Sequence, residues 1–297
     1  MDDRARQLAV VSGKGGTGKT SVVGSLAALA QPCVLADCDV DAPNLYLLTQ
    51  PQVDRQQEFW GSKQVRRDTS RCRGAGECER RCRFGAITRT TENPRACEGC
   101  GLCVLACPNG ALELVPALTG HCYVSGTPYG PLAHARLRPG GGNSGKLVTE
   151  VRALAQETAT ERAAPLVIID GPPGIGCSAI AAIADADMVL IVAEPTASSL
   201  HDLERVVKLV RHFGLPAAVI LNKADLSEPQ AAAVRGFCSV QEVPLVGEIP
   251  FDETVPKAVS QGVPVVTVPG SPAGDALREI WKWVARALGA DGSPSLS

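Results

Sequence analysis

A glycine-rich loop near the start of the chain constrains its fold more than any other feature. The loop Gly13-Lys-Gly-Gly-Thr-Gly-Lys-Thr20 fits the pattern G-x-x-x-x-G-K-[S/T]. It follows an apolar run, Leu8–Val11, and precedes a stretch of small apolar residues, Ser21–Ala30, that is typical of a helix. Because a phosphate-binding loop requires this strand–loop–helix context, the sequence predicts an α/β fold.

The same loop predicts a nucleotide site. Its glycines allow successive backbone N–H groups to curl around phosphate oxygens, and the positive end of the following helix dipole favours the same charge. In this pattern Lys19 reaches the β- and γ-phosphates, and the Thr20 hydroxyl ligates Mg²⁺. The residues expected to bind the nucleotide are Gly13, Lys14, Gly15, Gly16, Thr17, Gly18, Lys19, Thr20 and Ser21.

Short apolar runs recur along the chain and alternate with helical patterns. Apolar residues make up 45% of the chain and charged residues 20%, which is typical of a folded chain with a large core. Apolar residues at helical spacing mark 201–213 and 277–288 as helices. The expected fold is a P-loop NTPase with a mostly parallel sheet flanked by helices. The runs expected as buried strands are Leu8–Val11, Cys33–Ala36, Leu166–Ile169, Met188–Val192, Ala217–Leu221 and Val265–Val268.

A second lysine, Lys14, lies directly after the first glycine of the loop. With it, the loop resembles the deviant Walker A motif of the ParA/MinD, nitrogenase-iron-protein and Mrp-like ATPases. In those families this lysine crosses a dimer interface to the nucleotide of the partner. The resemblance therefore implies an ATP-dependent homodimer in which Lys14 and Lys19 are catalytic, because both stabilise charge in the transition state.

The resemblance extends to acidic residues at strand ends. Asp37-Cys-Asp-Val-Asp-Ala-Pro-Asn-Leu45 resembles switch I of these families. Its position implies that Asp39 orients the attacking water or serves the Mg²⁺ shell, with Asp37 and Asp41 as alternatives. Leu166-Val-Ile-Ile-Asp-Gly-Pro-Pro-Gly174 resembles the Walker B segment with switch II, which implies that Asp170 holds Mg²⁺ through water. The expected Mg²⁺ residues are Thr20, Asp39 and Asp170.

Two later segments predict the base pocket. Asn222-Lys-Ala-Asp225 fits N-K-x-D, a pattern whose carboxylate reads guanine in GTPases. Here the deviant loop favours ATP over GTP, with Asn222 on the amino edge of adenine. Glu248-Ile-Pro-Phe-Asp252 resembles the later loop that lines the base in the same families. The residues expected around the base are Asn222, Asp225 and Pro250.

Seven of the twelve cysteines lie between positions 72 and 107, where the sequence repeats after 25 residues. Cys97-x2-Cys100-x2-Cys103-x3-Cys107-Pro108 matches the run that binds iron–sulfur clusters in bacterial ferredoxins. A zinc site is the alternative, although zinc ribbons use two C-x2-C pairs instead. The repeat places Cys72 on Cys97, Cys78 on Cys103 and Cys82 on Cys107, and Cys100 falls on Ala75.

In such a run the fourth cysteine binds the neighbouring cluster, so that ligands cross between the repeats. Crossed ligation groups Cys82 with Cys97, Cys100 and Cys103 as a complete set for [4Fe–4S]. The other set has three thiolates because Ala75 replaces the fourth, and we expect it to hold [3Fe–4S]. A [4Fe–4S] cluster with one labile iron, or an empty site, is the alternative. The three residues of this second set are Cys72, Cys78 and Cys107.

From about residue 8 to residue 288, the sequence resembles MinD-superfamily P-loop ATPases that contain an inserted ferredoxin domain. The resemblance implies an ATPase domain made of residues 1–61 and 119–297. It also implies a small α+β, two-cluster ferredoxin-like domain at 62–118. The function implied is ATP hydrolysis with ATP-dependent homodimerisation coupled to electron transfer. An Fe–S carrier or assembly ATPase, or a redox-sensing ParA/MinD-like positioning switch, is the alternative.

Charge and hydropathy limit the partners. Residues 62–118 carry ten basic and six acidic side chains, which favours an acidic redox protein or a subunit of a metal–sulfur complex. The whole chain has a net charge of −2, so we expect no nucleic-acid binding. No apolar run approaches the ~18 residues of a membrane span, and the first residues lack the apolar segment of a secretory signal. We therefore expect a cytoplasmic protein.

Overall fold

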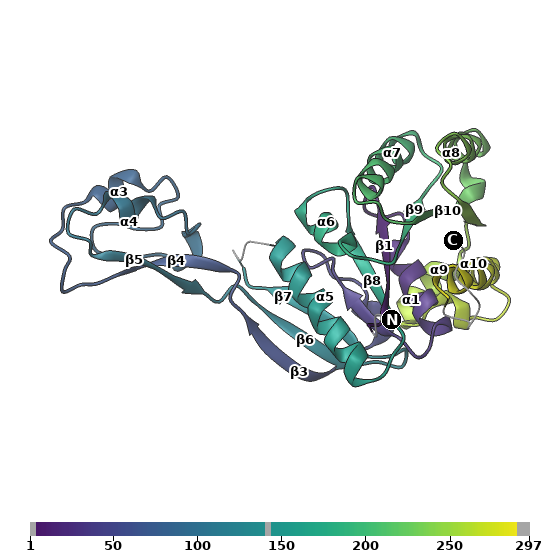
Figure 1. Ribbon diagram of the computed structural model, residues 1–297, viewed down its shortest axis with the longest axis horizontal. Coiled ribbons are helices and arrows are strands. Elements are labelled where there is room, and N and C mark those ends of the chain that lie inside the picture. Colours follow the sequence, from purple (N-terminus) through teal and green to yellow (C-terminus); the bar gives the residue numbers. More distant parts are fainter. Residues whose placement is uncertain (1–3, 140–143, 290–297) are drawn as a thin grey trace.

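The computed structural model describes residues 4–139 and 144–289, which form an α/β body from which a small lobe projects (Figure 1). The body contains a nine-stranded sheet with the order β11-β10-β9-β1-β8-β2-β7-β6-β3. Strands β11 to β7 in this order run parallel, and β6 is antiparallel to both β7 and β3. The expected mostly parallel sheet is confirmed. Its strands are β1 (Arg6–Ser12), β2 (Val34–Asp37), β3 (Gln52–Phe59), β6 (Gly120–Gly126), β7 (Leu132–Leu137), β8 (Leu166–Pro173), β9 (Met188–Ala193), β10 (Ala217–Asn222) and β11 (Leu245–Ile249).

The central strands are apolar on both sides because helices cover both faces of the sheet. In β1, Leu8 and Val10 belong to one hydrophobic core, whereas Ala9 and Val11 belong to the other. Since successive side chains of a strand point to opposite faces, a strand covered on both faces needs an uninterrupted apolar run. The short runs identified in the sequence are therefore typical of this layered fold.

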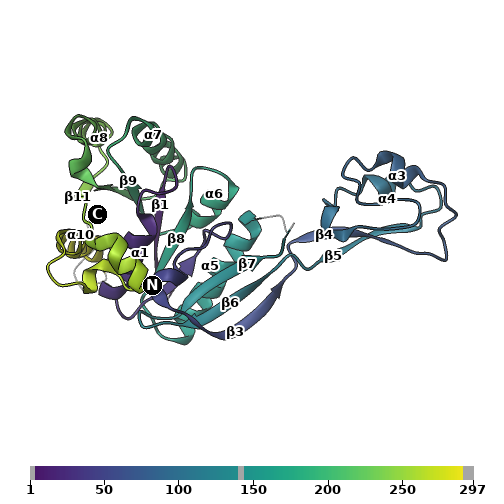
Figure 2. The same ribbon diagram turned by 180° about the vertical axis from the view of Figure 1, so that it is seen from behind.

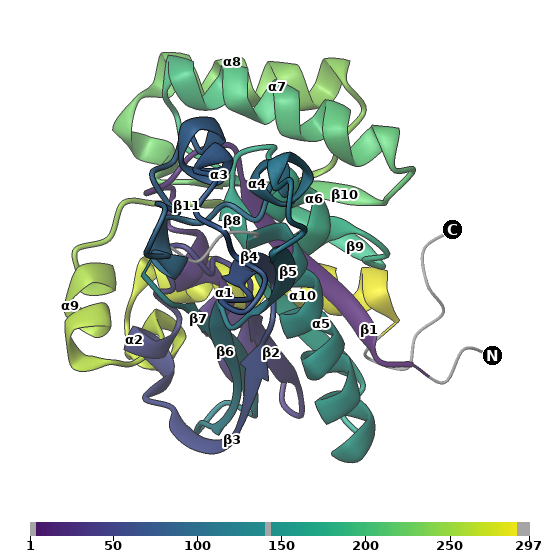
Figure 3. The same ribbon diagram turned by 90° about the vertical axis from the view of Figure 1, so that its left-hand side faces the viewer.

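Two layers of helices enclose the sheet. Seen with the lobe toward the viewer, α7 and α8 lie together above the sheet, and α9 lies away from them (Figure 3). One face is covered by α1 (Lys19–Leu29), α9 (Thr254–Gln261), the 3-10 helix η3 (Val265–Thr267) and α10 (Pro272–Leu288). The other face is covered by α5 (Ser144–Glu161), α6 (Cys177–Ile183), α7 (Ala197–His212) and α8 (Glu228–Val240). The short helices α2 (Tyr46–Thr49) and η2 (Ala224–Leu226) lie in connections.

One expected strand, Val265–Val268, is wrong: its first three residues form the 3-10 helix η3 (Val265–Thr267). The backbone N–H groups of Thr267 and Val268 donate to the carbonyls of Pro264 and Val265, each at 3.0 Å. Val265 is buried with α1 and α10 on one face of the sheet, so its apolar run serves packing beneath helices. A short apolar run alone does not distinguish these two outcomes.

The N-terminus of α10 is held by a polar network that predicts a measurable loss of stability. The buried Ser271 hydroxyl accepts a hydrogen bond from the Gly274 N–H at 3.0 Å and donates to Asp252 Oδ2 at 2.6 Å. Burial opposes ionisation of Asp252, but hydrogen bonds from Ser271 and Thr254 lower its pKa to about 2. Replacing Ser271 with Ala should lower the free energy of unfolding by about 1–2 kcal/mol in chemical denaturation. An unchanged denaturation midpoint would contradict this prediction.

A buried histidine in β7 predicts that stability falls in acid. His134 contacts the Ser125 hydroxyl at 2.8 Å, and burial, followed by the charge of Arg136, lowers its pKa to about 4. Between pH 6.5 and 4 the unfolded chain therefore binds a proton that the folded chain does not. This difference should lower the free energy of unfolding by about 3 kcal/mol as the pH falls through that range. We expect His134→Gln to remove this component in urea denaturation, and parallel pH profiles for both proteins would argue against it.

The lobe that projects from the body has its own two-stranded antiparallel sheet, β4 (Ser62–Arg67) paired with β5 (Leu112–Ala117). Between these strands lie α3 (Glu77–Arg81), the 3-10 helix η1 (Pro94–Ala96) and α4 (Leu102–Ala106). Views from both sides show that the lobe extends away from the body beyond β3 and β6 (Figures 1 and 2). At the junction, Thr119 Oγ1 accepts a hydrogen bond from the Gly61 N–H at 3.0 Å.

The 25-residue repeat of the sequence is present in the backbone of the lobe. Helices α3 and α4 begin and end 25 residues apart, and each follows a left-handed glycine, Gly76 with φ 78° and Gly101 with φ 77°. Glycine is the residue that adopts this conformation without strain. Gly74 and Gly99 are also left-handed, with φ 70° and 63°. The lobe is therefore built from two copies of one small unit.

The hydrophobic core of the lobe is small. Its buried members are Val65, Ile87, Cys103 and Leu112, and five partly buried residues pack against them, four of which are cysteines. A unit of this size normally needs a disulfide, a metal or a partner to be stable by itself. All seven cysteines of the lobe are free thiols, so disulfides do not supply that stability.

The part of the chain that the structure describes contains no helix that is both long and apolar enough to cross a membrane.

Candidate functional site

The glycine-rich loop connects β1 to α1 at the carboxyl end of the parallel strands, where α/β proteins bind ligands. Gly16 and Gly18 are left-handed, with φ 81° and 86°, and Gly18 directly precedes α1. A side chain at Gly13 would collide with the Cβ of Asp202 in α7, so this position also requires glycine. The expected strand–loop–helix geometry is present.

The loop opens into a cavity of about 630 Å³. Switch I contributes Asp39 and Asp41 to its wall, and the end of β8 contributes Pro172 and Pro173. Residues 15–21, which are most of the expected nucleotide-binding set, line the same cavity. The structure thus places the loop, switch I and switch II around one space.

A buried ion pair lies below this cavity. Lys19 Nζ donates to Asp170 Oδ1 at 2.5 Å, and the two side chains are only 7% and 1% exposed. The second oxygen of Asp170, Oδ2, is buried without a hydrogen-bond partner, and so is the hydroxyl of Thr17. Buried polar atoms without partners are costly and are commonly satisfied by a ligand or water. These two atoms fit the binding of Mg²⁺ and phosphate at this place.

The three aspartates of switch I have different surroundings. Asp37 is 1% exposed, and its carboxylate accepts hydrogen bonds from the N–H groups of Asp39 and Leu45, both at 3.2 Å. Burial, followed by the negative charge of Asp170, raises the pKa of Asp37 to about 8. Burial also raises the pKa of the half-buried Asp39. The geometry assigns Asp37 to holding the switch I loop and leaves Asp39 and Asp41 at the cavity.

In this structure, the segments that we expect to line the base form hydrogen bonds with the glycine-rich loop and with each other. Asn222 Nδ2 donates to the carbonyl of Thr17 at 2.7 Å. Asp225 Oδ1 accepts a hydrogen bond from the N–H of Phe251 at 2.7 Å, which joins this turn to the segment that contains Pro250. The structure therefore brings Asn222, Asp225 and Pro250 into one region, and their contact with a base remains a prediction.

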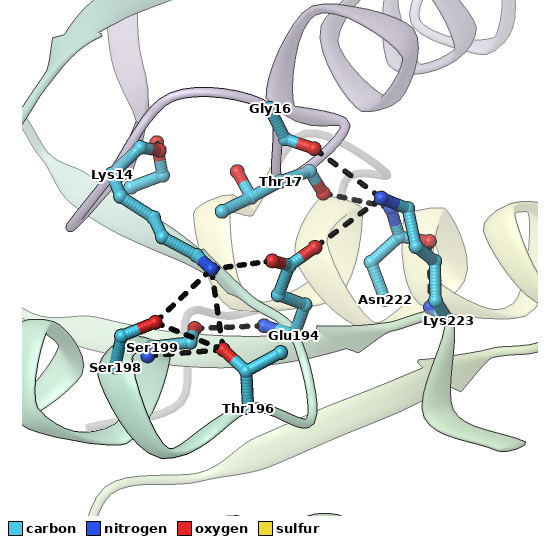
Figure 4. A network of polar contacts seen from close by, with 10 residues as sticks. Lys14, Gly16, Thr17, Glu194, Thr196, Ser198, Ser199, Asn222 and Lys223 are labelled. Atoms are coloured by element: carbon cyan, nitrogen blue, oxygen red, sulfur yellow. Dashed lines mark hydrogen bonds and ion pairs between the residues drawn. The ribbon is translucent and has the colours of Figure 1, made fainter. Parts of the chain in front are cut away.

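Lys14, which follows the first glycine of the loop, lies outside the phosphate cavity. Its ammonium group forms an ion pair with Glu194 Oε1 at 2.6 Å and contacts the hydroxyls of Thr196 and Ser198 (Figure 4). Lys223 Nζ contacts the other oxygen of Glu194, Oε2, at 3.2 Å. The sequence did not identify Glu194, because the only local sign of this residue is that it follows a buried apolar run. Its position near Lys14 depends on the strand order, which places β9 beside β1.

Comparison with known proteins decides the family. A family model described as the CobQ/CobB/MinD/ParA nucleotide binding domain matches residues 8–265. The chain belongs to this family. An uncharacterized protein of Methanocaldococcus jannaschii is 32% identical over 281 residues, which cover 93% of this chain and 95% of that protein. An uncharacterized ATP-binding protein of the same organism is 34% identical over 127 residues, or 42% of this chain and 47% of that protein.

Solved structures of the MinD/ParA family share the fold of this chain. MinD of Pyrococcus horikoshii, solved with Mg-ADP, has a TM-score of 0.59 at 21% identity and covers 96% of this chain and 98% of its own. A chain of the MinC:MinD cell division protein complex of Aquifex aeolicus has a TM-score of 0.59 at 18% identity, with 99% of both chains covered. The chain therefore has the α/β P-loop fold of these structures, in agreement with its membership of the CobQ/CobB/MinD/ParA nucleotide binding domain family.

Among the cavities that the described lobe residues line, two separate the seven cysteines of the lobe into two groups. The first cavity, of about 250 Å³, is lined by Cys82, Cys97, Cys100 and Cys103. The second, of about 20 Å³, is lined by Cys72, Cys78 and Cys107, and Ala75 also contributes to its wall. These groups coincide with the two ligand sets that crossed ligation defines, and ligation itself remains a prediction.

Backbone N–H groups point at the cysteine sulfurs of both cavities. The N–H of Ala86 donates to Cys82 Sγ and the N–H of Ala111 donates to Cys107 Sγ, both at 3.3 Å. The N–H of Val65 donates to Cys97 Sγ at 3.4 Å. Hydrogen bonds to sulfur stabilise thiolates and tune the potentials of iron–sulfur clusters. The donor set of the lobe therefore fits thiolate ligands.

Within residues 4–139 and 144–289, no group of three or more His, Cys, Asp or Glu residues is arranged to hold a single metal ion. A zinc ion needs four ligands at about 2.0–2.3 Å from one centre. The arrangement of the lobe cysteines therefore does not support the zinc alternative. The same finding gives no support to an iron–sulfur site, so cluster ligation also remains a prediction.

Proposed function

We propose that the chain is a nucleotide-dependent switch of the MinD/ParA type that forms a homodimer with Mg·ATP and carries iron–sulfur clusters on its lobe. The observation that carries this proposal is the position of switch I. The segment that lines the nucleotide cavity at Asp39 leads through α2 and β3 directly into β4 of the lobe. A conformational change of switch I in response to the γ-phosphate would therefore reach the cysteine cavities through a short stretch of the chain.

The nucleotide part of the proposal rests on the loop and the buried pair beneath it. Backbone N–H groups of residues 15–19 would hold the phosphates, and Lys19 would turn from Asp170 toward them. Thr20 and Asp170 would hold Mg²⁺, which neutralises phosphate charge when it is bound. Asp39, at the cavity wall, would orient the attacking water. The orphaned Oδ2 of Asp170 and the orphaned hydroxyl of Thr17 support this assignment.

The dimer part of the proposal rests on Lys14. Its side chain is 29% exposed and lies at the rim of the loop rather than in the phosphate cavity of its own subunit. A cation in this position has its full effect only when another subunit brings a second nucleotide to it. Family membership and the fold shared with MinD support an ATP-dependent homodimer.

The cluster part of the proposal rests on the two cavities. Cys82, Cys97, Cys100 and Cys103 would hold [4Fe–4S]. The three thiols of the smaller cavity, Cys72, Cys78 and Cys107, would hold [3Fe–4S], with a labile [4Fe–4S] cluster or an empty site as the alternative. When bound, such clusters supply one-electron redox chemistry. The small core of the lobe, with cysteines packed around it, supports their presence.

The fold shared with solved MinD structures favours a MinD/ParA-like switch, with the clusters as its redox sensor, over ATP-gated electron transfer. The paired cavities and the positive lobe favour electron transfer as the second candidate, with an acidic redox protein or a metal–sulfur complex subunit as partner. Cluster delivery to another protein is a third candidate, which only the incomplete three-thiol set favours.

Sedimentation of anaerobically reconstituted protein with ATP, ADP or no nucleotide tests the switch. We expect a dimer with Mg·ATP and a monomer otherwise, and we expect reduction with dithionite to change the dimerisation constant. A change of cluster potential with ATP, at an unchanged dimerisation constant, would favour the electron-transfer candidate instead. Loss of iron to an apo-ferredoxin would favour delivery. A monomer in all conditions would refute the switch.

A further inference from the structure

Glu194, directly after β9, lies between two lysines that come from distant parts of the chain. Its Oε1 is 2.6 Å from Lys14 Nζ and its Oε2 is 3.2 Å from Lys223 Nζ (Figure 4). The Glu194 side chain is 13% exposed, whereas the lysines are 29% and 31% exposed. One largely buried carboxylate therefore compensates two ammonium groups at the edge of the phosphate loop.

The contacts of Lys14 all lie on the side of α7. Its ammonium group reaches Thr196 Oγ1 at 3.2 Å and Ser198 Oγ at 3.3 Å, in the turn that begins α7. The preceding residue, Gly13, packs so closely on Asp202 of α7 that it has no room for a side chain. Lys14 is therefore held against α7 and away from the phosphate cavity.

The position of Glu194 is itself fixed. Its backbone N–H donates to Ser199 Oγ at 3.0 Å, and its carboxylate is anchored by Lys223, which also donates to the carbonyl of Gly16 at 3.3 Å. Burial opposes ionisation of Glu194, but hydrogen bonds from Lys14 and Lys223 lower its pKa. If Lys14 leaves, Lys223 still compensates the carboxylate, so release does not leave a buried charge without a partner.

From this geometry we infer that Glu194 is a positioning residue that holds Lys14 in the free subunit and thereby sets how readily two subunits associate. The inference rests on the proposed Mg·ATP-dependent dimer, in which Lys14 serves the nucleotide of the other subunit. For two subunits to associate, Lys14 must leave the Glu194 carboxylate and contact the phosphates of the nucleotide in the other subunit. The strength of the Glu194 contact therefore opposes dimerisation, and Lys223 weakens that opposition by sharing the carboxylate.

Two substitutions should shift the association in opposite directions. Glu194→Gln keeps the shape and removes the charge, so we expect half-maximal association at about fivefold lower protein concentration. Lys223→Met leaves Lys14 as the only cation on Glu194, so we expect about fivefold higher concentration to be needed. The measurement is sedimentation equilibrium with Mg and a non-hydrolysable ATP analogue. A matched control is Glu204→Gln in α7, which removes an exposed carboxylate that pairs with Lys208 at 2.6 Å.

A fluorescent ATP analogue, titrated at a concentration where the protein is monomeric, separates association from nucleotide affinity. We expect Glu194→Gln to leave this monomer affinity unchanged, which a merely structural defect would not do. If the unsubstituted protein does not associate at any concentration, the proposed dimer is wrong and the inference fails with it. If it associates but Glu194→Gln needs equal or more protein, the role of Glu194 is wrong while the dimer stands.

Discussion

Replacing Lys19 with Met should abolish ATP hydrolysis and should also destabilise the nucleotide-free protein. Lys19 is the only cation paired with the buried Asp170 among the contacts of the described residues. Loss of its contact with the transferred phosphate should lower the hydrolysis rate by about 100-fold or more. Removing one member of a buried ion pair should also lower the free energy of unfolding by about 3 kcal/mol. Phosphate release and urea denaturation measure these two effects.

The two effects of Lys19→Met can be separated by a second substitution. Asp170→Asn in the same chain removes the uncompensated carboxylate, so it should restore most of the lost stability but none of the hydrolysis. Lys282→Met is the matched control, because Lys282 pairs with Glu279 at 2.7 Å on an exposed surface of α10. Its removal should change neither quantity beyond about 0.5 kcal/mol or twofold in rate. Retained hydrolysis in Lys19→Met would exclude the proposed phosphate site.

Replacing Ala75 with Cys should convert the three-thiol cavity of the lobe into a four-thiol site. Ala75 lies between Gly74 and Gly76, and Cys100 lies between Gly99 and Gly101 with the same left-handed glycines on either side. A cysteine at position 75 would therefore be presented to its cavity as Cys100 is to the other. We expect iron content to rise from about seven to about eight per chain. The EPR signal of oxidised [3Fe–4S] should disappear at the same time.

Removing Cys100 tests the larger cavity by the opposite change. Cys100→Ala leaves the larger cavity with three thiols, the number that the smaller cavity has. The protein should therefore lose about one iron per chain and gain an EPR signal of [3Fe–4S]. Cys238→Ala is the control, because Cys238 is buried in the body, within the hydrophobic core that α8 helps to form. Iron analysis and EPR under anaerobic conditions measure both variants. An iron content near zero in the reconstituted, unsubstituted protein would exclude clusters on the lobe.

The sequence predicted the centre of the fold well because its strands are covered on both faces. Such strands must be apolar throughout, and five of the six expected runs lie in β1, β2, β8, β9 and β10. The strands of this sheet that it missed are β7, β6 and β3, which form one end of the sheet, and the edge strand β11 at the other end. Strand β3 is mostly exposed, and Val265–Val268 is apolar because it packs under helices. An apolar pattern indicates that a segment is buried, but it does not indicate whether the backbone of that segment forms hydrogen bonds within a helix or with a neighbouring strand.

Local spacing alone determined the phosphate loop and the cysteine repeat. These features depend on backbone conformation within a few residues, which glycines and fixed intervals impose directly. Only the tertiary structure decided that Glu194 and Lys223 lie beside Lys14, and that Asp37 is buried while Asp39 faces the cavity. Those relations arise from strand order and packing, which place Glu194 and Lys223 beside a lysine 180 and 209 positions earlier in the chain. No local pattern in the sequence encodes them.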